Sequence, residues 1–274
     1  MYSKKDLLNQ LEALNIDREG TLLVHSSYKS MGDIEGGPAT VLDALSEFMK
    51  NGLLVLPTHT WEYINKDNPV FDVKESPSNV GVLTELFRKR EGVVRSEHPT
   101  HSVAALGKEA KSFTEGEYQF STACARESVW GKLVDRQAQI LMLGVDLTKC
   151  TFIHGIEEWM EVPNRLSETP ETLYSILHTG KKVEIPTYRH SGPDWSERFW
   201  KVDEILDEEG AQIKGQLGDA MVRLVDAAQT NDVLSELLQK NPELFTEDKP
   251  LEDKWRYYFR NKKSNEGNQH ETDD

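Results

Sequence analysis

Short apolar runs alternate with helical segments through the first half of the chain, and this rhythm constrains its fold more than any other feature. Strands are predicted at residues 21–25, 53–56 and 140–143, which are dominated by Leu, Val, Ile and Met. Helices are predicted at residues 38–49, which begin with a proline, and at residues 151–159. Strand–helix alternation is typical of α/β proteins. We therefore expect a mixed, largely parallel central sheet flanked by helices.

Capping residues mark two further helix starts. Ser3 precedes four leucines at helical spacing, which predicts an N-terminal helix. Ser78 is predicted to cap a helix that turns Leu83, Leu86 and Phe87 inward. Both serines can accept a hydrogen bond from a free N–H group of the first turn.

The chain beyond residue 165 has a different pattern. Residues 173–177 and 182–186 flank Thr179-Gly180 and predict a β-hairpin, which gives a hairpin-containing second half. Helices are also predicted at residues 196–209, 232–238 and 255–259, and a strand at residues 220–225. Because no repeat or low-complexity linker interrupts the chain, we expect a single domain over residues 1–274 with a subdomain seam near residue 165.

Charge and cysteine content narrow the class of partner. The formal net charge is −15 at pH 7, whereas a general nucleic-acid binder carries a basic face. This acidity favours a cationic small molecule or simply solubility. Cys124 and Cys150 form no CxxC pair, residues 2–6 are too polar for a secretory signal, and no run reaches about 20 apolar residues. We expect a cytoplasmic protein that binds neither nucleic acid nor a membrane; an oligomer is compatible with the sequence.

Three clusters of polar residues could carry chemistry. The first follows the strand at residues 21–25 and reads HSSYKSMG at residues 25–32. Ligands of α/β folds bind at the carboxyl ends of strands, and hydroxyl and N–H groups here could hold a phosphate whose charge Lys29 offsets. The spacing is neither that of a Walker P-loop nor that of a GxSxG nucleophile elbow. Composition alone favours a turn with capping serines.

The second cluster reads RSEHPTHS at residues 95–102 and joins two predicted strands, residues 93–95 and 102–106. Arg95 could bind a carboxylate or a phosphate through two parallel hydrogen bonds, or it could pair with a surface acid. His98 precedes Pro99, which predicts a structural turn residue and not a base.

The third cluster reads TFIHGIEE at residues 151–158. On a helix, His154 and Glu157 share a face, and Glu158 lies four residues after the histidine. A carboxylate beside an imidazole fixes the tautomer and favours the protonated form, as a general base requires. A helix-start histidine paired for solubility would have the same spacing. A HExxH zinc site would need a histidine where Glu158 stands, so no metal is predicted.

Taken together, these clusters resemble the aminoglycoside 3-N-acetyltransferase family. Each motif is weak alone, but five in order over about residues 20–225 are specific. The motifs are VHSS at 24–27, LPTHT at 56–60, RSEHPTHS at 95–102, TFIHGIE at 151–157 and GDA at 218–220.

The resemblance implies a mixed α/β fold and the transfer of an acetyl group from acetyl-CoA, a co-substrate, to an amine of an aminoglycoside or a similar polyamine-like acceptor. It implies that His154 is the general base, oriented by Glu157, and that transfer is direct. The residues that it implies for binding CoA are Ser26, Ser27, Tyr28, Lys29, Ser30, Met31, Val94, Arg95, Ser96 and Ser102.

The sequence also departs from the family pattern. Thr60 and Val129 stand where the family has Ser and Pro, and residues 186–194, where acceptor loops should lie, match only loosely. Acids that could line a site for a cationic acceptor are Glu62, Asp67, Asp72, Glu158 and Asp194. Two alternatives stay open: a serine hydrolase that uses Ser26 or Ser27 with a histidine, and a CoA-binding protein without turnover.

Overall fold

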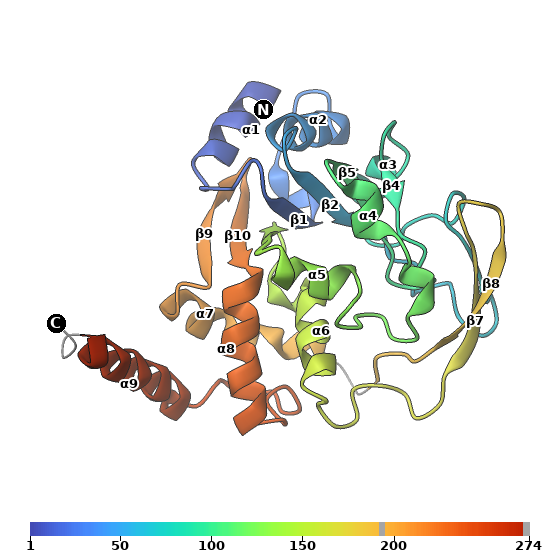
Figure 1. Ribbon diagram of the computed structural model, residues 1–274. Coiled ribbons are helices and arrows are strands. Elements are labelled where there is room, and N and C mark those ends of the chain that lie inside the picture. The colour runs from blue at the N-terminus through green and yellow to red at the C-terminus, as the bar shows by residue number, and fades with distance from the viewer. Residues whose placement is uncertain (192–194, 271–274) are drawn as a thin grey trace.

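A seven-stranded sheet forms the centre of the protein in a computed structural model, which describes residues 1–191 and 195–270 (Figure 1). Its strands are β1 (Thr21–Ser26), β2 (Leu53–Pro57), β4 (Val94–Arg95), β5 (Val103–Gly107), β6 (Gln139–Leu143), β9 (Gln212–Leu217) and β10 (Ala220–Asp226). They lie in the order β4-β5-β2-β1-β6-β10-β9. Pairing is parallel where β1 meets β2 and β6, and antiparallel at every other junction. The predicted mixed α/β class is confirmed, but the sheet is not largely parallel, because parallel pairing is confined to the three central strands β2, β1 and β6.

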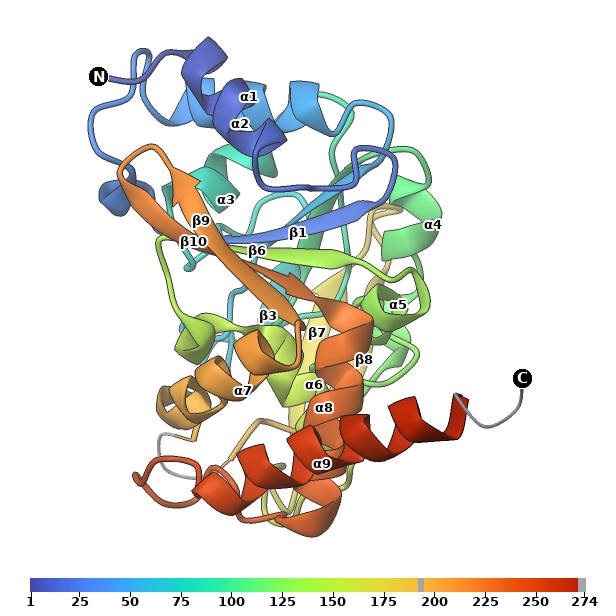
Figure 2. The ribbon, with the colours of Figure 1, turned by 90° about the vertical axis from the view of Figure 1, so that its left-hand side faces the viewer.

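Helices cover both faces of this sheet (Figure 2). The α-helices are α1 (Lys4–Glu12), α2 (Pro38–Phe48), α3 (Val82–Phe87), α4 (Ala110–Thr114), α5 (Val129–Asp135), α6 (Thr151–Trp159), α7 (Asp203–Glu208), α8 (Ala227–Lys240) and α9 (Asp253–His270). Short 3₁₀ helices are η1 (Tyr28–Met31), η2 (Glu117–Gln119), η3 (Leu147–Lys149) and η4 (Ser196–Val202). Figure 2 shows α1 and α2 above the sheet, and α6, α7 and α8 below it.

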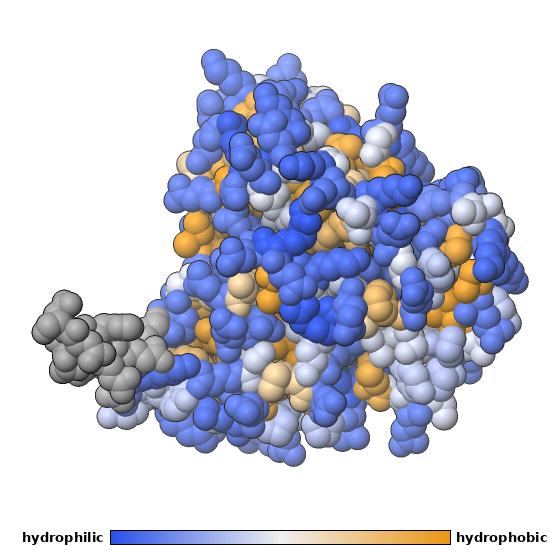
Figure 3. Space-filling model, viewed as in Figure 1, coloured by the Kyte–Doolittle hydropathy of each residue, from blue (hydrophilic) through white to orange (hydrophobic). Residues whose placement is uncertain are grey.

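The central strands β1, β2 and β6 are mostly apolar because both faces of the sheet meet a core there. Side chains alternate along a strand, so Leu22 and Val24 enter the core beneath α1 and α2, while Leu23 enters the core that contains Trp130. All three are at most 1% exposed. The surface outside these cores is mostly hydrophilic on the face drawn in Figure 3, which agrees with the high charge of the chain.

The predicted helix starts are correct at one site and wrong at another. Ser3 caps α1, and it forms a capping box with Asp6. Ser78 does not cap α3, because that helix begins after Gly81, and the serine hydroxyl lies 3.0 Å from the Thr84 hydroxyl instead. Leu86 was expected to point inward but is 41% exposed, because the buried face of the helix is formed by Leu83, Thr84 and Phe87.

A second, three-stranded sheet stands beside the first (Figure 1). It contains β3 (Val70–Asp72), β7 (Glu171–Ile176) and β8 (Lys182–Thr187) in that order. The β7–β8 pair is the predicted hairpin, and β3 comes from the segment for which no strand was predicted. Strands from both sides of residue 165 join the large sheet, so the proposed seam does not separate two sheets. Over the described residues, no helix has both the length and the apolar character needed to cross a membrane.

Candidate active site

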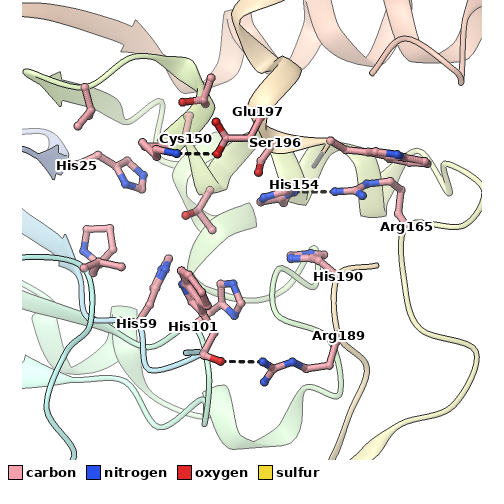
Figure 4. Close-up of a pocket in the computed structure, with 18 of the residues that line it drawn as sticks. His25, His59, His101, Cys150, His154, Arg165, Arg189, His190, Ser196 and Glu197 are labelled. Carbon is pink, nitrogen blue, oxygen red and sulfur yellow. Dashed lines mark hydrogen bonds and ion pairs between the residues drawn. The ribbon is translucent and has the colours of Figure 1, made fainter. Parts of the chain in front are cut away.

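A cavity of about 600 Å³ opens where β1 and β2 end and α6 begins (Figure 4). His25 and Ser26 come from the end of β1, and His59 follows β2. His154 lies in the first turns of α6, whose N-terminus faces the same space. The carboxyl ends of adjacent parallel strands meet at one edge of a sheet, which explains why side chains distant in sequence gather here.

The structure brings His154 and Glu157 together, as their spacing on a helix predicts. His154 Nδ1 lies 3.3 Å from Glu157 Oε2. The Arg165 guanidinium enters the same group, because its Nη2 lies 2.9 Å from both His154 Nδ1 and Glu157 Oε2. Arg165 also donates to the Ser191 carbonyl at 2.7 Å and lies over the Trp195 ring. A buried arginine therefore links the candidate base, its carboxylate and the segment that ends at residue 191.

Burial sets the protonation of this group. It lowers the pKa of His154 well below its ordinary value, and neighbouring His190 and Arg165 lower it further. It raises the pKa of Glu157 to about 7, while Arg165 pulls in the opposite direction. An arginine cannot lose its proton in a protein, so an arginine 2.9 Å away favours the ionised carboxylate. His154 is thus neutral at neutral pH and free to accept a proton.

Four histidines form a continuous chain of rings along the cavity wall. The His154 ring stacks on His190 at 4.4 Å between centroids. His101 meets His190 edge-on at 5.5 Å and lies 4.7 Å from His59. Such closely packed rings cannot all be in the charged imidazolium form, because like charges at these distances repel.

One group of side chains near the cavity has the chemistry of a metal site. Ligand atoms of Cys124, Glu158 and His190 all lie within 4.8 Å of one another. His190 Nε2 and Glu158 Oε1 are already hydrogen-bonded to each other at 2.6 Å, and the Cys124 amide donates to the same carboxylate. Glu158 Oε1 and His190 Nε2 therefore have each other as hydrogen-bond partners without an ion.

The residues of the first predicted cluster lie in two environments. Ser26 lines the cavity. Ser27 precedes η1, which is formed by Tyr28–Met31, and the Ser30 hydroxyl donates to the Ser27 carbonyl at 2.7 Å. Met31 is buried in the core beneath α2, and Tyr28 packs against that core. Among the described lining residues, only Ser26 represents this predicted CoA-binding set; the other contacts remain predictions.

Of the second cluster, His101 lines the cavity, whereas the residues predicted to bind CoA, which are Val94, Arg95, Ser96 and Ser102, lie outside its lining. Arg95 is 3% exposed, and its guanidinium donates to the hydroxyl groups of Thr58 and Ser102 and to the carbonyls of Thr58 and Ser76. Val103 donates to the Ser96 hydroxyl. Arg95 therefore ties the segment before α3 to the large sheet, and it pairs with no surface acid among the described residues. A contact of Val94, Arg95, Ser96 or Ser102 with CoA remains a prediction.

Several residues that line the cavity were not among the predicted site residues. They are His59, His101, Arg165, Arg189, His190, Trp195 and Glu197. A signal for two of them was present, because the LPTHT motif places His59 just after a predicted strand and the RSEHPTHS motif places His101 just before one. No pattern marks Arg165 or His190, which come from connecting segments.

The cavity lining has little acidic character. Among the described lining residues, Glu197 is the one carboxylate, and it is paired with Lys149 at 2.8 Å. Glu158 lies behind His190. Glu62, Asp67 and Asp72 do not line the cavity, and Asp194 falls outside the described residues.

Comparison with known proteins finds relatives that match most of this chain. Residues 23–239 match the family described as aminoglycoside 3-N-acetyltransferase. Aminoglycoside N(3)-acetyltransferase IV from Salmonella sp. is 30% identical over 227 residues, which are 82% of this chain and 82% of that protein.

Solved structures agree with this match. A mutant of aminoglycoside acetyltransferase AAC(3)-IVa in complex with a gentamicin superposes with a TM-score of 0.78 and 29% identity, over 89% of this chain and 91% of the other. AAC-IIIb in a binary complex with CoASH has the same fold, with a TM-score of 0.75 and 24% identity over 91% of this chain and 99% of that chain.

Proposed function

We propose a specific reaction for this chain, which belongs to the aminoglycoside 3-N-acetyltransferase family: His154 removes a proton from an amine of an aminoglycoside or a similar polyamine-like acceptor as that amine takes the acetyl group of acetyl-CoA. The observation that carries the proposal is the position of His154. It is a neutral imidazole on the wall of the cavity at the carboxyl ends of β1 and β2, with a buried carboxylate behind it.

The chemistry needs a base because an alkylamine is mostly protonated at neutral pH. The neutral amine attacks the thioester carbon, and the nitrogen must then lose a proton. His154 Nε2 accepts that proton, the C–S bond breaks, and the leaving CoA thiolate takes the proton from the imidazolium, which returns to the neutral form. Glu157 stabilises the imidazolium that forms at the intermediate stage, since it is the carboxylate nearest to Nδ1.

Two groups compete for His154 Nδ1. Arg165 Nη2 can only donate to it, which would place the imidazole proton on Nε2, whereas Glu157 can accept a proton from it. A base needs Nε2 unprotonated, so the reactive tautomer has its proton on Nδ1 and directed at Glu157. In that state Arg165 pairs with Glu157 alone, at the 2.9 Å separation that it already has.

The two substrates follow from the relatives and from the shape of the cavity. CoA is bound in the AAC-IIIb complex and gentamicin in the AAC(3)-IVa complex. A single cavity of about 600 Å³ is of the size that small-molecule sites have, and direct transfer needs both reactants in it at once. The lining carries Lys149, Arg165 and Arg189 beside one carboxylate, Glu197, so the acceptor class is carried by the relatives and not by the charge of the lining.

An acceptor panel tests the function. The purified protein is mixed with acetyl-CoA and with gentamicin, apramycin, sisomicin, spermidine or a neutral amino sugar, and thiol release is followed together with the mass of the product. Acetylation of at least one aminoglycoside is expected, with a mass gain of one acetyl group. Faster acetylation of the neutral amine than of every polycation would overturn the acceptor class, and no transfer to any amine would overturn the function.

A further inference from the structure

Two buried imidazole nitrogens on the cavity wall have no role in proton transfer. His25 and His59 are 8% and 3% exposed, and the Nε2 atom of each has no hydrogen-bond partner among the described residues. Both residues line the same cavity as His154. A buried polar atom without a partner costs free energy unless a ligand supplies the hydrogen bond.

The His59 ring is held by packing, which leaves Nε2 free. Its edge meets the fully buried Trp130 ring at 5.7 Å between centroids, and the His101 ring lies 4.7 Å away. Figure 4 shows His59 on the wall of the cavity across from Cys150 and His154. A side chain fixed by aromatic contacts loses little freedom when a ligand binds, so it can act as a preorganised hydrogen-bond donor.

Charge identifies the ligand atom that this donor suits. Burial holds the pKa of His59 well below its ordinary value, and the neighbouring histidines and Arg95 lower it further. A neutral imidazole with its proton on Nε2 donates a hydrogen bond without transferring the proton, which makes it a partner for a carbonyl oxygen that gains negative charge. In acetyl transfer that atom is the thioester oxygen.

We propose that His59 Nε2–H is the hydrogen-bond donor to the thioester carbonyl oxygen of acetyl-CoA and to the oxyanion that this oxygen becomes. The proposal rests on the acetyl transfer proposed above. The amine nitrogen forms a bond to the carbonyl carbon, and the carbonyl π electrons move to the oxygen facing His59. The C–S bond then breaks as the carbonyl re-forms, the amine proton passes to His154, and the thiolate leaves. The proton of His59 stays in place throughout.

His59 is favoured over His25 because a series of ring contacts connects it to the base. His59 contributes to lowering the pKa of His154, and it connects to that ring through His101 and His190. The base contacts the amine nitrogen and the oxyanion donor contacts the carbonyl oxygen. Both atoms are bonded to the same carbon in the intermediate, so both side chains must lie near it. His25 stacks on Trp130 further along the wall and is the alternative donor that the test separates.

The kinetic test compares His59→Leu, which removes the donor, with His59→Gln, whose amide N–H lies near the position of Nε2. We expect His59→Leu to lower kcat about 10²- to 10³-fold with little change in the KM for acetyl-CoA. His59→Gln should recover at least about tenfold of that loss. His178→Gln is the matched control, because His178 lies outside the cavity lining and its Nε2 bonds to the Arg95 carbonyl; its kcat should stay within about twofold.

A spectroscopic test needs no turnover and therefore separates this proposal from the proposed function. The probe is a ketone analogue of acetyl-CoA in which a methylene group replaces the sulfur, labelled with ¹³C at the carbonyl. Its carbonyl stretching band should shift to lower frequency on the wild-type protein and return toward the solution value on His59→Leu. Melting temperature and analogue affinity, measured on the same samples, show that the variant is folded and occupied.

The outcomes are distinct. A wild-type protein that shifts the carbonyl band yet acetylates no amine refutes the proposed function and leaves the His59 contact standing. An active enzyme in which folded His59→Leu keeps both kcat and the band shift refutes the His59 proposal. Loss of both in His25→Leu, with His59→Leu unaffected, also refutes it and assigns the donor to β1.

Discussion

Replacement of His154 by alanine separates a catalytic histidine from a structural one. General-base assistance contributes about 10²- to 10⁴-fold, so kcat should fall by that factor, which corresponds to about 3–5 kcal/mol of activation free energy. The affinity for CoA should change little, because a base acts on the proton of the acceptor and not on the donor substrate.

The structure also gives the expected effect on stability. The His154 side chain is 17% exposed and packs on the rings of His190 and Phe199. Its removal costs these ring contacts, about 1–2 kcal/mol, but it leaves the Glu157–Arg165 ion pair intact at 2.9 Å. The melting temperature should therefore fall by only a few degrees.

Three measurements on one preparation decide the question: single-turnover acetyl transfer, CoA affinity by calorimetry, and melting temperature. His178→Ala is the control, since it removes a histidine outside the cavity lining. A folded His154→Ala protein that binds CoA and keeps near-normal turnover would refute the general-base reasoning. Parallel loss of CoA binding, melting temperature and activity would assign His154 a structural role.

Three further predictions follow from the same contacts. Saturating CoA, at about 100 times its Kd, should add about 3 kcal/mol of stability and raise the melting temperature; a thermal shift assay with no change, together with no heat of binding, would contradict the donor. Glu157→Gln should reduce activity less than His154→Ala but lower stability more, by about 3–5 kcal/mol, because it leaves the Arg165 guanidinium buried without its carboxylate partner. Urea unfolding compares the stability of the two variants. A loss of stability in Glu157→Gln that is equal to or smaller than that in His154→Ala would contradict the role of the ion pair. Stability should fall as the pH drops below about 6.5, because the unfolded chain then binds more protons than the folded protein. The cause is burial, which lowers the pKa of five histidines, namely His25, His59, His98, His101 and His154. Each of them lowers the free energy of unfolding by about 1 kcal/mol per pH unit. Glu117 and Glu157, with pKa values raised to about 7, act in the opposite direction but are fewer, so a urea midpoint as high at pH 5.5 as at pH 7.5 would be contrary to expectation.

Elements with a strong local pattern were predictable from the sequence. The α6 helix and the β7–β8 hairpin were found because helical spacing and turn residues are properties of consecutive residues. The β9 strand was missed, since its sequence QIKGQL has polar residues on a partly exposed edge, and β3 was missed because it has only three residues. The late start of α3 depends on Gly81, whose positive φ of 119° cannot be predicted from the spacing of apolar residues.

The site was predictable only where its chemistry is local. His154 and Glu157 lie on one helix, so their spacing in the sequence predicts their contact. Arg165 reaches the same pair from the connection after α6, and His59 reaches the cavity from the end of β2, so both depend on tertiary contacts that spacing cannot show. Arg95 shows the converse case. Its motif suggests a ligand, whereas its guanidinium is engaged by groups of the protein itself.

The order of strands in the large sheet has a consequence for biogenesis. Leu22 of β1 pairs with Gln139 of β6, and Gln139 pairs in turn with Asp226 of β10, so the centre of the sheet joins segments that are far apart in the sequence. Such long-range pairing makes folding slow, and the apolar β1 strand lacks its β6 partner until β6 has been synthesised. Overproduction at low temperature, which slows synthesis and weakens hydrophobic association, should therefore yield more native protein than fast synthesis at high temperature.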